Sequence, residues 1–333
     1  MNELEFGTIL PYIDNENVTD INYNGHNLWI DDLKLGRYLV DDFDNDEFMQ
    51  QFAYKCANFV NMSFNVTSPL IEAETSSLRI SIVHDSIAKS GNSISIRKTP
   101  AKLRLTRRTM LEEKYTTLAV LEFLEQCVKK HLNIMVCGLP GVGKTELVKY
   151  LSSFIRDNER VITIEDTLEL RYHDIHSDKD CVALKINEQF DYVDAIKASL
   201  RQRPNWILVS EVRSVEVVYL LESISTGANI ISTLHCSHAA DIPKRILTMF
   251  PQTNHDHSSL MHSIYDSIDI GILITSTFNA SGIKRCIQEI VSFNDGEETT
   301  IDNIYIKGKG MSELPEYLND KLEIKKVKRN KND

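Results

Sequence analysis

The spacing of apolar residues changes about a third of the way along the chain. Up to residue 100, short runs with alternating apolar and polar positions predict strands, with one amphipathic helix at residues 46–61. From residue 116 onward, longer helical patterns alternate with short apolar strands. This change predicts a small α+β domain followed by an α/β domain, whose mostly parallel sheet has helices on both faces.

The pattern also sets the expected boundaries: a first domain at 1–100, a linker at 101–115, a second domain at 116–312 and a basic tail at 313–333. The tail has six basic and two acidic residues from position 321 onward, which predicts disorder or a loose partner contact. In the first domain we expect strands at 18–23, 28–30 and 37–40, and a second small sheet from 70–73, 78–83 and 93–96. In the second we expect strands at 160–164, 206–210, 229–233, 271–274 and 288–293, and helices at 116–131, 192–202, 215–225 and 239–250.

A glycine-rich loop follows the apolar run at residues 133–137. Its spacing is G-x-x-x-x-G-K-T, and its residues are Gly138, Gly141, Gly143, Lys144 and Thr145, with a helical pattern beginning at Glu146. Glycines let backbone N–H groups face an anion, the lysine reaches the β- and γ-phosphates, and the hydroxyl binds Mg²⁺. The loop therefore predicts a site for a nucleoside triphosphate with Mg²⁺, and the family resemblance described below implies ATP.

Polar side chains follow three of the expected strands. Glu165 and Asp166 come after one strand, Glu211 after the next and His235 after a third. Because ligands of such sheets bind at the carboxyl ends of the strands, we expect these groups to converge on the loop. A carboxylate there binds Mg²⁺ or orients the attacking water, and an imidazole bonds the γ-phosphate.

The composition argues against a nucleic-acid-binding, secreted or membrane-spanning protein. The chain has 333 residues and a formal net charge of −11, which argues against a general nucleic-acid binder. Its six cysteines form no C-x-x-C pair, which is typical of a reduced cytosolic protein. Its first residues lack the pattern of a secretory signal, and no apolar run is long enough to span a bilayer. We expect a cytoplasmic protein.

With these motifs in order, the sequence resembles the secretion ATPase superfamily, the hexameric motors of type II and type IV secretion and of Tad or type IV pilus assembly. The matching segments are the phosphate loop, T-I-E-D-T-L-E-L at 163–170, R-Q-R-P-N at 201–205, S-E-V-R at 210–213 and S-T-L-H at 232–235. The chain departs from the family pattern at Ser210, where glycine is usual, and at Ala228, where histidine is usual. The absence of a tetracysteine zinc segment favours the type IV secretion, conjugation or Tad pilus branches.

The resemblance implies a RecA-like P-loop ATPase domain after a PAS-like N-terminal domain, whose Arg79 and Arg97 would reach the phosphates. It further implies that Thr145 and Glu211 hold the metal, that Glu165 polarises the attacking water and that His235 senses the γ-phosphate. Arg201 and Arg203 would neutralise charge within or across subunits, and the division of roles between Glu165 and Glu211 stays open. The implied partners are a homo-hexamer and inner-membrane components of the machine, which hold the protein at the cytoplasmic membrane, without sequence-specific nucleic-acid binding.

Two other hypotheses remain open from the sequence. A RecA-like DNA translocase would share the phosphate loop, although the acidic composition and the lack of a basic-aromatic stretch count against it. An ATP-dependent assembly protein with negligible turnover would be compatible with the departures at Ser210 and Ala228.

Overall fold

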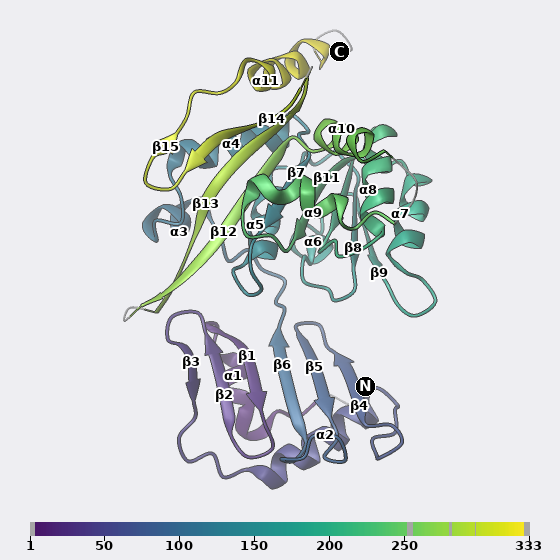
Figure 1. Cartoon of the computed structure of the whole chain (residues 1–333). Coiled ribbons are helices and arrows are strands. Elements are labelled where there is room, and N and C mark those ends of the chain that lie inside the picture. Colours follow the sequence, from purple (N-terminus) through teal and green to yellow (C-terminus); the bar gives the residue numbers. More distant parts are fainter. Residues whose placement is uncertain (1–3, 252–255, 280–281, 297, 330–333) are drawn as a thin grey trace. The chain divides into compact units, whose positions relative to one another are not determined.

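The computed structural model describes residues 4–251, 256–279, 282–296 and 298–329, and Figure 1 shows their helices and strands. The chain divides into two compact units. The first consists of Met1–Pro100 with Thr277–Lys284, and the second of Ala101–Ser276 with Arg285–Asp333.

The first unit contains a six-stranded sheet and a helix. Its elements are η1 (Gly7–Ile9), α1 (Leu10–Asp14), β1 (Val18–Tyr23), β2 (Leu28–Asp32), β3 (Gly36–Leu39), α2 (Asp46–Phe59), β4 (Leu70–Glu74), β5 (Leu78–Val83) and β6 (Ser93–Lys98). The strand order is β3-β2-β1-β6-β5-β4. The expectation of two separate small sheets was wrong, because β1 pairs antiparallel with β6, with Ile21 opposite Ile96. This pairing joins segments about 75 residues apart, which local sequence patterns do not reveal.

Helix α2 covers this sheet with its apolar face. Met49, Phe52 and Cys56 are fully buried in one cluster with alternate residues of the strands, such as Ile80 on β5. Among the aromatic residues of α2, Phe52 is fully buried, whereas Phe59 is 36% exposed.

The second unit is built on a nine-stranded mixed sheet of order β15-β14-β13-β12-β7-β11-β10-β8-β9. The strands are β7 (Ile134–Cys137), β8 (Val161–Glu165), β9 (Cys181–Lys185), β10 (Trp206–Val209), β11 (Asn229–Leu234), β12 (Ile270–Asn279), β13 (Gly282–Asp295), β14 (Thr299–Ile306) and β15 (Gly310–Met311). In this order, the neighbouring strands β12, β7, β11, β10, β8 and β9 pair in parallel. At the other edge, β14 pairs antiparallel with both β13 and β15. The parallel part was expected, but the antiparallel extension was not.

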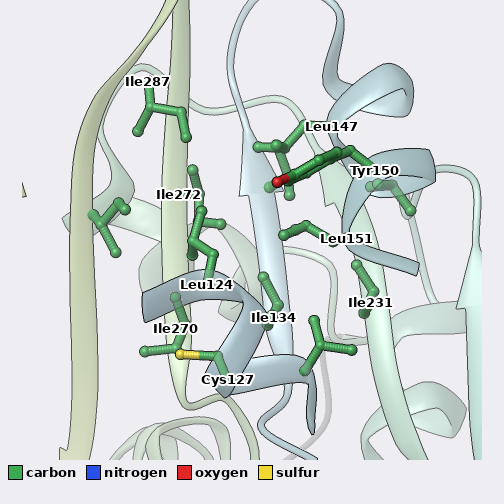
Figure 2. Packing of buried hydrophobic residues seen from close by; sticks show 14 of the residues in the cluster. Leu124, Cys127, Ile134, Leu147, Tyr150, Leu151, Ile231, Ile270, Ile272 and Ile287 are labelled. Carbon is green, nitrogen blue, oxygen red and sulfur yellow. The ribbon is translucent and has the colours of Figure 1, made fainter. Parts of the chain in front are cut away.

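Two hydrophobic clusters lie on the two faces of this sheet, because successive residues of a strand point to opposite faces. On β7, Ile134 belongs to one cluster and Met135 to the other. Figure 2 shows the first cluster, in which Leu124 of α4 and Leu151 of α5 pack beside Ile134 and Ile272. The helices of this unit are α3 (Arg107–Glu112), α4 (Leu118–Lys129), α5 (Lys144–Ser152), α6 (Tyr172–Ile175), α7 (Tyr192–Leu200), α8 (Glu216–Ser225), η2 (Ala239–Asp241), α9 (Ile242–Leu247), α10 (His257–Ser267) and α11 (Glu316–Arg329).

Two segments expected to lack regular structure contain helices. Part of the expected linker forms α3, which begins after Thr106, whose side chain makes a capping box with Thr109. The tail forms α11 up to Arg329, and the last four residues lie outside the described part. The charged residues from position 321 onward predicted disorder. The buried residue that packs this helix on the core, Leu318, lies before them in the sequence. Lys321 also pairs with Asp269, Nζ to Oδ1, at 2.7 Å.

No described helix combines the length and the apolar character needed to cross a bilayer.

Candidate nucleotide-binding site

The glycine-rich loop joins β7 to α5 in the centre of the parallel sheet. Gly138 has φ +147°, and a Cβ there would lie 2.5 Å from the carbonyl oxygen of Ile274 on β12. Gly143 caps α5 with φ +92°, a left-handed conformation that side chains disfavour. These two glycines let the loop turn tightly against the neighbouring strand and leave the first N–H groups of α5 free of intrahelical partners. Such a helix start attracts phosphate.

Lys144 points back into this loop and is buried, with only 8% of its surface exposed. Its Nζ lies 3.0 Å from the carbonyl oxygen of Gly138 and 3.1 Å from His235 Nδ1. Burial lowers the pKa of Lys144, while the carboxylates of Glu211 and Glu169 act in the opposite direction. The amine is therefore held at the loop by these two contacts, within electrostatic reach of two carboxylates.

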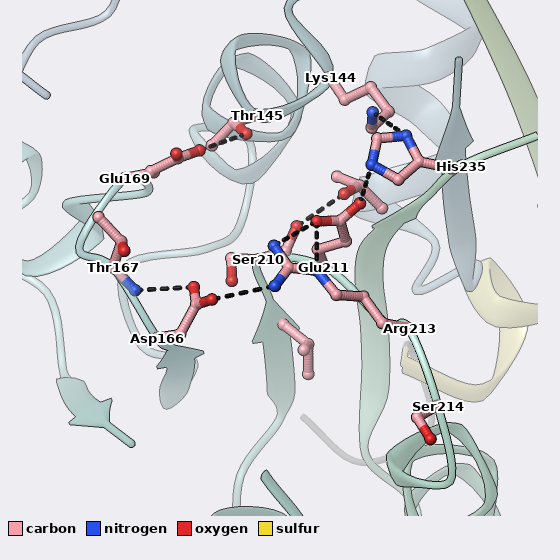
Figure 3. A network of polar contacts seen from close by, with 12 residues as sticks. Lys144, Thr145, Asp166, Thr167, Glu169, Ser210, Glu211, Arg213, Ser214 and His235 are labelled. Atoms are coloured by element: carbon pink, nitrogen blue, oxygen red, sulfur yellow. Dashed lines mark hydrogen bonds and ion pairs between the residues drawn. The ribbon is translucent and has the colours of Figure 1, made fainter. Parts of the chain in front are cut away.

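The predicted strand-end residues converge beside Lys144, as Figure 3 shows. His235, just after β11, lies with Nε2 2.5 Å from Glu211 Oε1. The other oxygen of Glu211 accepts from Arg213 Nε at 2.7 Å, and Arg213 Nη1 lies 3.2 Å from Asp166 Oδ2. Charged groups from the ends of β8, β10 and β11 thus form one continuous network at the phosphate loop.

Glu165 occupies a different environment from the one expected for a residue that polarises water. It ends β8 and is 1% exposed, and its Oε1 accepts from the N–H groups of Glu169 at 2.9 Å and Leu170 at 2.7 Å. Burial raises the pKa of Glu165 to about 7, although these two hydrogen bonds lower it. The side chain therefore organises the turn that follows β8.

That turn presents Glu169 to the phosphate loop. Glu169 Oε2 accepts from the Thr145 hydroxyl at 3.0 Å. The sequence contained this residue in the matched segment 163–170, but no role was predicted for it. A carboxylate four residues beyond the strand end is a weak signal by itself, and only the backbone turn brings it back to the loop.

The oxygen atoms at this position suit Mg²⁺. Thr145 supplies a hydroxyl that bonds to Glu169, and the carboxylates of Glu169 and Glu211 both lie close enough to act on the charge of Lys144. Mg²⁺ prefers such hard oxygen ligands and is usually bound through one or two carboxylates together with substrate phosphates. Within the described residues no group of three or more His, Cys, Asp or Glu side chains forms a metal site of its own.

Two further residues of this segment are Gly141, in the loop, and Glu146, in the first turn of α5. Gly141 has φ +77° with open space at its Cβ position, and Glu146 Oε1 pairs with Lys149 Nζ at 3.0 Å. At the departures from the family pattern, Ser210 has its Oγ 3.3 Å from the Tyr192 hydroxyl, and Ala228 is buried.

The structure does not bring all predicted arginines to the network. Arg201 and Arg203 are exposed and precede β10, whereas Glu211 follows it, so the four-residue strand, about 13 Å long, separates them. Arg79 and Arg97 belong to the first unit, where they are cross-strand neighbours on β5 and β6. Their Nε atoms lie 3.5 Å from Glu72 and 2.9 Å from Asp20, respectively. The roles of these four arginines remain predictions.

Known proteins resemble both the sequence and the fold. An uncharacterized Bacillus anthracis protein is 27% identical over 325 residues, which are 93% of this chain and 73% of that protein. The type IV secretion system protein VirB11 of Bartonella quintana is 37% identical over 131 residues, which span 38% of this chain and 36% of VirB11. The crystal structure of the pilus retraction motor PilT with bound ADP matches with a TM-score of 0.65 at 20% identity, covering 99% of this chain and 89% of that one.

The family model described as type II/IV secretion system protein matches residues 68–294, more than half of the chain. This range includes the phosphate loop and the strand ends that carry Glu165, Glu211 and His235. The chain therefore belongs to the type II/IV secretion system protein family.

Proposed function

We propose that this chain is an ATP-hydrolysing motor of a protein-secretion, conjugation or pilus-assembly machine. In this proposal it works as a homo-hexamer on inner-membrane components at the cytoplasmic face, and its second unit acts as a RecA-like ATPase domain. The observation that carries the proposal is the convergence of Lys144, Glu211 and His235 on the phosphate loop. The similarity to PilT, a pilus retraction motor with bound ADP, and to VirB11 supports it.

The residues divide the chemistry as follows. Lys144 and the N–H groups at the start of α5 bind the β- and γ-phosphates, and His235 moves from Lys144 toward the γ-phosphate. Thr145 and Glu211 would hold Mg²⁺, which neutralises charge on the phosphates during transfer. Because Glu211 contacts both His235 and Arg213, release of the γ-phosphate changes an ion-pair network that reaches Asp166.

For the attacking water we propose Glu169 or Glu211 rather than Glu165. Glu165 uses Oε1 to hold two backbone N–H groups and is nearly inaccessible to solvent. Glu169 has a carboxylate oxygen at the Thr145 hydroxyl, and its charge acts on Lys144. A general base must lie within hydrogen-bond reach of the proton that it removes, directly or through one water.

The test is steady-state phosphate release from ATP with Mg²⁺, together with the mass of the particle in solution. We expect a hexamer-sized species whose turnover falls about 100-fold or more in Lys144→Ala and in Glu211→Gln. Glu222→Gln changes an exposed carboxylate on α8 and is the matched control. If the native chain binds ATP and assembles but releases no more phosphate than the two variants, the motor is refuted in favour of an assembly protein with negligible turnover.

A further inference from the structure

A second polar cluster lies beside the phosphate loop and has no part in the network around Glu211. It consists of Arg104, before α3, Tyr115, before α4, Glu146 on α5 and Arg285 on β13. All four residues belong to the second unit. Arg104 Nε and Nη2, the Tyr115 hydroxyl and Glu146 Oε2 are buried without a hydrogen-bond partner.

The cluster brings two guanidinium groups together. Burial lowers the pKa of Arg285 and the nearby positive charge of Arg104 lowers it further, while Tyr115, Glu113 and Glu146 act to raise it. Neither guanidinium group, of Arg104 or of Arg285, forms a side-chain hydrogen bond or an ion pair with any other residue that the structure describes. The one carboxylate on α5 is already shared, because Glu146 Oε1 pairs with Lys149 at 3.0 Å. Two guanidinium groups therefore lie partly desolvated without an acceptor, an arrangement that an anion would complete.

The position of Arg285 relates this cluster to the nucleotide. A Cβ on Gly143 would lie 3.6 Å from Arg285 Cδ and 4.0 Å from its Nε, so this side chain runs along the end of the phosphate loop. In the sheet, β11, β10 and β8 lie on one side of β7 and carry His235, Glu211 and the turn of Glu169. The strands β12 and β13 lie on the other side.

This order fixes the direction of a bound nucleotide. The γ-phosphate must face the carboxylates and the histidine, on the β10 and β11 side. The α-phosphate and the ribose, which do not react, then extend from the loop across the start of α5, toward β12 and β13. That is where the unpaired guanidinium of Arg285 lies.

We infer that Arg104 and Arg285 bind the α-phosphate and ribose end of the nucleotide, and so make the site specific for nucleoside diphosphates and triphosphates over inorganic phosphates. This inference rests on the nucleotide-binding part of the proposed function. Guanidinium groups donate paired hydrogen bonds to phosphate oxygens.

The experiment measures binding by calorimetry and thermal unfolding in the whole 333-residue chain, with ADP and with inorganic phosphate as probes. We expect Arg285→Met and Arg104→Met each to raise the dissociation constant for ADP about 10- to 100-fold, because each variant removes charge-assisted hydrogen bonds. Inorganic phosphate, which fills a single phosphate position of the loop, is expected to bind within twofold of its native affinity. Arg108→Met is the matched control, since Arg108 is exposed and pairs with Glu112.

A second readout separates binding from a structural role. Removing a desolvated cation that lacks a partner does not destabilise the free protein, so the midpoint of thermal unfolding without nucleotide should stay the same or rise in Arg285→Met. The rise of the midpoint on adding ADP should shrink. Unchanged ADP affinity in both variants overturns the inference. Equal weakening of ADP and inorganic phosphate with a lower unfolding midpoint also overturns it, because the arginines would then only support the loop.

Failure of the proposed hydrolysis is distinguishable from failure of this inference. A native chain that binds ADP but releases no phosphate from ATP refutes the motor, yet the ADP affinities of the variants still decide the role of Arg104 and Arg285. A native chain that binds no ADP overturns the inference directly.

Discussion

Replacing Glu165 by glutamine tests whether this buried carboxyl holds the turn or takes part in the reaction. Glutamine keeps a side-chain oxygen that can accept from the N–H groups of Glu169 and Leu170, but it is neutral at every pH. The native carboxyl is 1% exposed, so its ionised form is costly in the folded state. We therefore expect Glu165→Gln to stabilise the protein at high pH.

The magnitude follows from the pKa. Burial raises the pKa of Glu165 from 4.5 to about 7, so between these values the folded state holds a proton that the unfolded state has lost. Stability then falls as the pH rises through this window, which is the opposite of the effect of a salt-bridged carboxylate. Between pH 5 and pH 8 the loss amounts to about 2 to 3 kcal/mol. Glu165→Gln should remove this loss and have little effect near pH 5.

The assay is urea unfolding of the native chain and of Glu165→Gln at several pH values from 5 to 8. Glu188→Gln, which changes an exposed carboxylate after β9, is the control and should leave the pH dependence unchanged. Phosphate release is measured in parallel and should stay within a few-fold of the native rate, because Glu165 does not face the reacting phosphate in our proposal. Equal pH dependence in the native and variant proteins would refute the buried-acid argument. Loss of turnover with normal stability would show that Glu165 takes part in the reaction, as the family resemblance implies.

Two further predictions concern the backbone around the loop. Gly138→Ala should lower the free energy of unfolding by about 2 kcal/mol or more and abolish ADP binding, because its Cβ would meet the Ile274 carbonyl oxygen at 2.5 Å; normal calorimetric binding of ADP would contradict this. Thr233→Val should cost about 1 to 3 kcal/mol in urea unfolding, because the Thr233 hydroxyl donates to the buried carbonyl oxygen of Ser210 at 2.7 Å. An unchanged unfolding midpoint would show that this hydrogen bond does not support the strand end before Glu211.

Much of the site could be predicted from the sequence because its parts are local. The glycines and Lys144 form a contiguous motif, and the apolar runs before Glu211 and His235 identify strands whose ends meet in a parallel sheet. The network of Lys144, His235 and Glu211 has the composition that these patterns predicted. Most strands of the first unit were also located correctly, because period-two alternation marks a strand that is buried on one face.

The remaining features depend on contacts between distant segments, which only the tertiary structure decided. The pairing of β1 with β6 joined two expected sheets into one, and Leu318 anchored a helix in a tail whose charges predicted disorder. Glu165 and Glu169 have the same side chain four residues apart, and the turn after β8 buries the first and presents the second to Thr145. Arg285 reaches the phosphate loop from β13, more than 140 residues further along the chain. Sequence patterns report which face of an element is buried, but side-chain environment depends on which elements pack together, and that is a property of the whole fold.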